Sequence, residues 1–142
     1  MRLLVLALLV TAACATVRPR PTSVPAPSDG SLAQIYYWRA KPGKLDEYSR
    51  YIREQAEPID HEAQRRGAFL SVATFISRDT LSPWTHMRVF ILRDSAQWRG
   101  LSGALDSAGL RLHPDSAVRA QRAAYSATLR DRVGSALLEI NR

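Results

Sequence analysis

Residues 68–76 limit the possible folds most strongly, because this predicted strand is apolar on both sides. The segment reads AFLSVATFI. Successive side chains of a strand point to opposite faces of the sheet, so Phe69 and Phe75 share one face while Leu70 and Val72 share the other. A sheet built on such a strand needs a cover on each face.

Four segments rich in β-branched and aromatic residues predict strands: residues 32–39, 68–76, 85–92 and 135–140. The loop between the second and third contains Asp79 and Pro83, which is typical of a hairpin connection. The domain is therefore expected to contain one sheet of four strands.

Apolar residues that recur every three or four positions predict three helices. The first is expected to kink at Pro58, which removes a backbone donor, and to end at Gly67. The second begins at the capping residue Asp94 and stops at Gly109. The third begins at Pro114. Its expected inward-facing residues are Val118, Tyr125 and Leu129.

The resulting order, β-α-β-β-α-α-β, predicts an α+β domain of the ferredoxin-like split βαβ type with one extra helix. Helices cover one face of the sheet in that fold, so the second apolar face is left open. We expect a homodimer partner to cover it. The alternative is that the extra helix and the loops do so.

Two stretches carry a family resemblance. One runs from KPGKLDEY at residues 41–48 through Pro58 to Gly67, and the other is FILRDSAQW at residues 90–98. Both resemble the dimeric α/β-barrel superfamily, which includes antibiotic-biosynthesis monooxygenases and EthD-like and NIPSNAP-like proteins. The resemblance implies two ferredoxin-like halves packed sheet to sheet, each with a pocket between sheet and helices. It implies no particular activity.

Residues 1–13 are predicted to be a signal peptide, because Arg2 precedes a short apolar run. The run is shorter than the ~20 residues that span a bilayer, which argues against the alternative of an uncleaved membrane anchor. Residues 11–14 (TAAC) resemble a bacterial lipobox, in which Cys14 would be lipidated and would attach the protein to membrane lipid in the cell envelope. Cleavage after Ala15 would instead give a soluble secreted or periplasmic protein.

Residues 14–31 are predicted to be an extended tether. Four of the eight prolines of the chain lie here, with Ser, Thr and Gly and few large apolar side chains. Such a segment cannot bury enough surface to order itself. The folded domain is therefore expected to comprise residues 32–142.

The candidate site residues lie on two predicted strands. His86 and Arg88 share a strand face and would suit acid–base catalysis and anion stabilisation. Tyr36 and Trp38 share a face of the first strand, so all four side chains could line one pocket for a flat ligand. The alternative roles are a solvated histidine, an interface ion pair for Arg88, and ordinary core contacts for the aromatic residues.

No sequence motif indicates a metal or cofactor. His61 follows Glu57 by one helical turn, but no second ligand pair accompanies it, and His113 precedes Pro114 in a predicted turn. Cys14 is the only cysteine, so a thiol nucleophile in the domain is excluded. No metal site and no cofactor are therefore predicted.

The net charge of +7 comes mainly from arginine, and one basic cluster stands out. It contains Arg119, Arg122, Arg130 and Arg132. A solvated surface is the interpretation favoured here over contact with anionic lipid, and nucleic acid is not an expected partner of an exported protein.

These patterns favour an exported, lipid-anchored domain that binds a small aromatic or apolar molecule. The first alternative is a cofactor-independent monooxygenase or isomerase acting on a small aromatic compound, with His86 and Arg88 in the reaction. The second is a structural envelope protein whose only role is association.

Overall fold

The computed structural model describes residues 26–28 and 30–141. The predicted signal peptide, Cys14 and most of the predicted tether lie outside the described residues. The elements follow in the order β1 (Ser31–Ala40), α1 (Leu45–Tyr51), η1 (Ile52–Ala56), α2 (Glu57–Arg65), β2 (Ser71–Ile76), β3 (His86–Leu92), α3 (Ser95–Leu112), α4 (Ser116–Leu129) and β4 (Arg130–Ile140).

The four strands form one antiparallel sheet in the order β2-β3-β1-β4. This order, together with helices between β1 and β2 and between β3 and β4, confirms the predicted ferredoxin-like α+β fold with one extra helix. No helix in the described part of the chain is long and apolar enough to cross a membrane.

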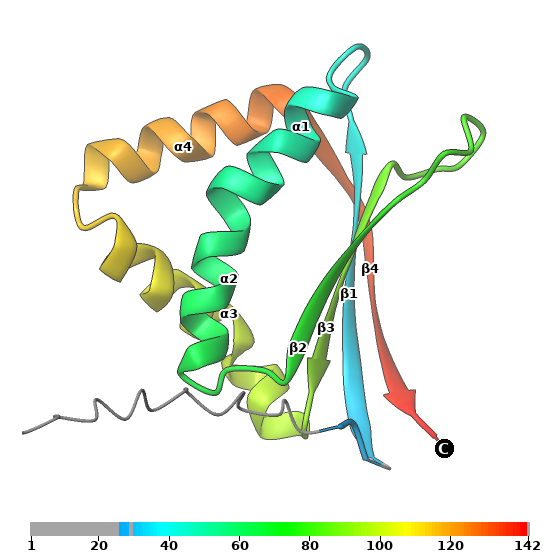
Figure 1. Cartoon of the computed structure of the whole chain (residues 1–142), viewed down its shortest axis with the longest axis vertical. Helices are drawn as coiled ribbons and strands as arrows, with labels where there is room; N and C mark the ends of the chain where they lie inside the picture. Colours follow the sequence, from blue (N-terminus) through cyan, green and yellow to red (C-terminus); the bar gives the residue numbers. More distant parts are fainter. Residues whose placement is uncertain (1–25, 29, 142) are drawn as a thin grey trace, which may run out of the picture.

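All the helices lie on the same face of the sheet (Figure 1). The extra helix therefore covers this face too, so the alternative in which it covers the second face is wrong. Phe90 and Leu92 of β3 point toward the helices and pack with Phe69, Leu101 and Ala108 in the main core. Phe69 precedes β2, which begins at Ser71, so the expectation that it shares a face with Phe75 is wrong: Phe75 lies on the other face of the sheet. The intervening residues of each strand point to the other face, which no element of the described chain covers.

The helical region after β1 changes its winding before Pro58, as predicted. Residues of η1 form a π-helix, and α2 then begins with Pro58 in its first turn. Proline has no backbone N–H, so the regular ladder of hydrogen bonds cannot pass through this position. Gly67 follows α2 with φ +80°, which confirms its predicted role after the helix end.

The second predicted helix is longer than expected. Asp94 caps α3 by accepting from the backbone N–H groups of Ala96 and Gln97. The helix does not stop at Gly109 but continues to Leu112. Packing on α2 outweighs the cost of about 1 kcal/mol that glycine brings to a helix interior, and Pro114 fixes the end instead.

The last strand is also longer than predicted, because its charged first half pairs with β1. Arg132 lies opposite Trp38, whereas Gly134 lies opposite Tyr37, so Val133 is an extra residue that forms a β-bulge. The bulge reverses the alternation of side chains. Arg130 and Arg132 consequently point to the helix-covered face, while residues beyond the bulge, such as Leu138, reach the open face.

Candidate functional site

A cleft of about 770 Å³ lies between helices α3 and α4, with α1, α2 and the adjoining ends of β1 and β4 at its borders. We call it the α4 cleft. Two aromatic residues, Trp38 of β1 and Tyr51 of α1, contribute to its walls. Its apolar lining also includes Ile59, Leu105 and Leu110. A cleft of this size and composition fits a small organic ligand.

The face of α4 that lines the cleft follows from residue spacing. Arg119, Arg122 and Ser126 recur at intervals of three and four and therefore share one side of the helix. Ala123 and Ala127 also line the cleft. Their small side chains leave the space between α3 and α4 unfilled.

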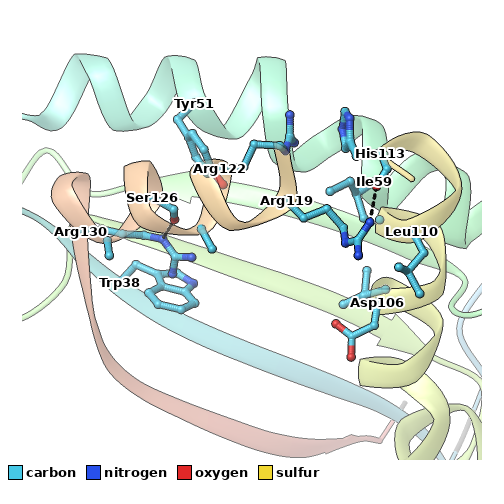
Figure 2. A pocket seen from close by; sticks show the side chains of 14 residues that line it. Trp38, Tyr51, Ile59, Asp106, Leu110, His113, Arg119, Arg122, Ser126 and Arg130 are labelled. Carbon is cyan, nitrogen blue, oxygen red and sulfur yellow. Dashed lines mark hydrogen bonds between the residues drawn. The ribbon is translucent and has the colours of Figure 1, made fainter. Parts of the chain in front are cut away.

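The two ends of the cleft differ in composition. Figure 2 shows Trp38, Ser126 and Arg130 together at one end. Ile59 and Leu110 lie toward the other end, which the polar side chains of Asp106, Arg119 and His113 also border (Figure 2). A bound molecule would therefore meet a cation stacked on an indole ring at one end and a mixed apolar and polar lining at the other.

Arg119 and Arg122 use their donors to hold the walls of the cleft. Arg119 Nη1 donates to the carbonyl oxygens of His113 (2.8 Å) and Pro114 (2.6 Å), which ties α4 to the end of α3. Arg122 donates to the side chain of Gln55 and, at 2.7 Å, to its carbonyl oxygen in the π-helix η1. These two arginines therefore already have partners.

Arg130 is bonded differently. Its guanidinium Cζ lies 3.3 Å from the centroid of the Trp38 ring, and its Nε donates to Ser126 Oγ at 3.0 Å. No Asp or Glu within the described residues forms an ion pair with it, and its buried Nη1 has no hydrogen-bond partner there. Burial lowers the pKa of Arg130 from its usual value. Stacking on tryptophan stabilises the cation in part.

The four residues predicted from the sequence do not meet in this cleft. Trp38 lines it, but Tyr36, His86 and Arg88 do not. All four side chains point to the helix-covered face. The period of two predicted that the members of each pair share a face, and the register of β1 with β3 places both pairs on the same one. Tyr36 instead packs edge to face on Phe90, with ring centroids 5.9 Å apart.

His86 is fully buried, with 0% of its surface exposed. Its Nε2 lies 2.9 Å from Ser49 Oγ, and its Nδ1 lies 2.9 Å from Thr85 Oγ1. The hydroxyls of Ser49 and Thr85 also contact the backbone carbonyls of Leu45 and Trp38, at 2.8 Å and 3.3 Å. Both ring nitrogens therefore have a hydroxyl partner, as a neutral imidazole with one donor and one acceptor requires. The ring of Tyr48 packs edge to face against the imidazole, with ring centroids 4.5 Å apart. Burial lowers the pKa of His86 to about 4, so it is neutral near pH 7.

Arg88 is buried beside Asp60 of α2, and the two form a salt bridge. Burial raises the pKa of Asp60, while the charge of Arg88 acts in the opposite direction. Nε of Arg88 has no partner within the described residues. The pair joins β3 to α2 in the core. Arg88 therefore forms its ion pair within one chain and not across a dimer interface.

The remaining two histidines occupy different positions in the fold. His61 is exposed on α2, whereas His113 ends α3 and lines the α4 cleft. Among residues 26–28 and 30–141, no group of three or more His, Cys, Asp or Glu could hold a metal ion.

Sequence reasoning missed the contribution of α4 to the cleft. It identified Arg119, Arg122 and Arg130 as a basic cluster but assigned them to a solvated surface. The spacing of residues 119, 122 and 126 by three and four was visible, and it places these side chains on one side of the helix. Only the packed structure shows that this side faces a cleft shared with α3, and that Arg130, at the start of β4, reaches the same cleft.

Known protein structures match this chain in fold. No protein-family model matches the sequence, and no curated protein sequence matches it either. HapK from Hahella chejuensis matches with a TM-score of 0.51 and 11% identity, over 78% of this chain and 92% of HapK. SnoaB, a cofactor-independent oxygenase from Streptomyces nogalater, matches with a TM-score of 0.52 and 13% identity, over 81% of this chain and 96% of SnoaB.

The chain has the ferredoxin-like fold of these two proteins. This is the fold that the resemblance to the dimeric α/β-barrel superfamily implied. At such low identity the likeness concerns the fold, and the function has to be argued from the α4 cleft itself.

Proposed function

We propose that this protein binds a small aromatic or otherwise apolar molecule in the α4 cleft. The observation that carries the proposal is the cleft of about 770 Å³ with Trp38 and Tyr51 in its walls and apolar side chains toward one end. Aromatic walls bury large apolar area and favour flat ligands. Of the predicted ligand-binding residues, Trp38 is the one that keeps this role.

Binding of N-phenyl-1-naphthylamine, a neutral probe that fluoresces in apolar surroundings, tests the proposal. We expect the full-length protein to bind it, and Ala127→Phe to weaken binding at least tenfold by filling the cleft. Ala120→Phe is the matched control, because Ala120 is exposed on α4 and does not line the cleft. Equal binding by both variants would contradict the proposed site.

A second candidate is a cofactor-independent oxygenase acting on a small aromatic compound, and the fold shared with SnoaB favours it. In the simplest case a bound quinol reacts with O2 to give a hydroxyquinone and water: one oxygen atom enters the ring, the other leaves as water, and the quinol itself supplies the electrons. The cation of Arg130 would stabilise the deprotonated quinol. His86 and Arg88 were predicted for this chemistry, but their enclosed positions place Arg130 ahead of them as the anion stabiliser.

Oxygen uptake separates the two candidates. An oxygenase consumes O2 in the presence of methylhydroquinone faster than autoxidation does, and Arg130→Met slows it. A binding protein consumes none beyond autoxidation. A protein that neither binds the naphthylamine nor consumes O2 would fit the structural envelope role instead.

We further propose that two copies of the chain associate through the open face of the sheet. This face carries apolar side chains, of which Phe75 is 48% and Leu138 is 52% exposed. Met87, Val89 and Ile91 of β3 also point to it, because alternate residues of that strand are buried against the helices. Apolar surface of this extent on a sheet favours association.

We also propose that the protein is exported and attached to the bacterial cell envelope through a lipid on Cys14. The short apolar run before Cys14 and the proline-rich segment after it support this location. Incorporation of labelled palmitate into the wild type, and its loss in Cys14→Ser, is the expected result. An unlabelled wild type would favour the soluble secreted form.

A further inference from the structure

We propose that the ligand of the α4 cleft is a flat, mainly apolar molecule carrying one oxyanion group, such as a carboxylate or phenolate, which Arg130 binds. The inference rests on the proposed function and specifies its ligand class. At one end of the cleft, the guanidinium of Arg130 lacks both an ion-pair partner and a hydrogen-bond partner for Nη1 among the described residues.

Buried and half-buried guanidinium groups in folded proteins are normally paired with an acid or with several acceptors. Arg88 satisfies this rule through Asp60, and Arg122 satisfies it through Gln55. Arg130 has one acceptor, Ser126 Oγ, and no ion-pair partner among the described residues. Arg119 donates from Nη1 to two carbonyl oxygens. Among the described residues that line the cleft, Arg130 is therefore the one with a buried side-chain nitrogen, Nη1, that has no hydrogen-bond partner.

The surroundings of Arg130 destabilise its positive charge when no anion lies nearby. Burial is the largest cause that lowers its pKa, and the charges of Arg88 and Arg132 act in the same direction. The ring of Trp38 offers an attractive face at 3.3 Å, but an aromatic face accepts no ordinary hydrogen bond. An anionic oxygen in the cleft would supply both the charge and the acceptor that this end lacks.

The rest of the cleft limits where the anionic group can lie. Ser126, which already accepts from Arg130, sits beside the guanidinium and can donate its hydroxyl proton to the same oxyanion. Asp106 borders the opposite end, and Arg119 there already donates from Nη1 to the carbonyl oxygens of His113 and Pro114. The geometry thus favours an oxyanion group at Arg130, with the apolar body of the ligand extending toward Ile59 and Leu110 (Figure 2).

A matched pair of probes tests this inference. The compound 8-anilino-1-naphthalenesulfonate differs from N-phenyl-1-naphthylamine by its sulfonate group, which stays ionised at all working pH values. We expect the wild-type full-length protein to bind the sulfonate at least about tenfold more tightly than the neutral compound, as one charge-assisted contact allows.

The variant Arg130→Met should abolish this difference, so that the two probes bind to it with affinities within about twofold of each other. Arg132→Met is the control, since Arg132 also lies near Trp38, at 5.9 Å, but is exposed and does not line the cleft. It should leave both affinities within about twofold. Arg130→Lys, which keeps the charge, should retain part of the preference if Arg130→Met does not fold.

The outcomes separate the two proposals. If both probes bind equally well to the wild type, or if Arg130→Met keeps the preference, the anionic ligand class is refuted and the apolar cleft stands. If Ala127→Phe fails to weaken the neutral probe while the sulfonate still depends on Arg130, the anion site stands and the proposed apolar function fails. Equal losses in Arg130→Met and Arg132→Met would indicate general attraction to positive charge and refute the site.

Discussion

His86 should make the stability of this protein depend on pH between about 6.5 and about 4. Burial lowers its pKa in the folded state from the ordinary 6.5 to about 4. In the unfolded chain the imidazole takes up a proton below about pH 6.5, whereas the folded chain takes it up only near pH 4. The unfolded state therefore binds more protons across this interval, and the free energy of unfolding falls as the pH falls.

The full shift corresponds to a loss on the order of 3 kcal/mol, since one pKa unit is worth about 1.4 kcal/mol. This is a large part of the stability of a typical domain, about 5–15 kcal/mol. Below pH 4 both states carry the proton, so the contribution of His86 becomes constant. Protonation of carboxylates also lowers the free energy of unfolding at low pH. The prediction therefore concerns the difference in pH dependence between the wild type and a variant that lacks His86.

The assay is urea unfolding at a series of pH values, followed by tryptophan fluorescence. His86→Gln, which can still donate to Ser49, should lose most of the pH dependence between about pH 6.5 and about pH 4. His61→Gln removes an exposed histidine and should keep the wild-type loss. The reasoning is refuted if His86→Gln loses as much stability over this interval as the wild type does.

Two further predictions concern the core and the open face. Asp60→Asn should destabilise the fold by about 3–5 kcal/mol in urea unfolding, because it leaves Arg88 buried without its counter-charge. Replacing both residues by apolar ones should recover most of this loss. An unaffected unfolding midpoint would show that the pair is dispensable. Val89→Asp should convert a sedimenting dimer into a monomer by placing a charge on the open face, and a monomeric wild type would rule out the dimer.

The fold was largely predictable because its determinants are local. Alternation along β3 placed His86 and Arg88 on one face together with Phe90 and Leu92, and the capping side chain of Asp94 marked the start of α3. Gly109 misled the prediction of the end of α3, since packing on α2 overrides a local helix breaker. Val118 and Tyr125 were expected to face inward, yet they are 41% and 44% exposed.

The candidate site was less predictable because it depends on how distant elements pack. The strand period says that Arg88 points toward helices, but not that Asp60 of α2 meets it there. Likewise, the sequence contains no sign that the ring of Tyr48 closes over His86 or that Arg130 stacks on Trp38. These contacts join residues far apart in the chain, and they decide which polar groups reach the cleft.

The β-bulge at Val133 divides β4 into two parts that serve different surfaces. Arg130, before the bulge, belongs to the ligand cleft, and Leu138, beyond it, belongs to the face proposed for self-association. Substitutions in one part leave the side chains of the other part in place. Ligand preference and assembly can therefore evolve independently along a single strand, whereas deletion of the bulge residue would couple them by moving one part onto the wrong face.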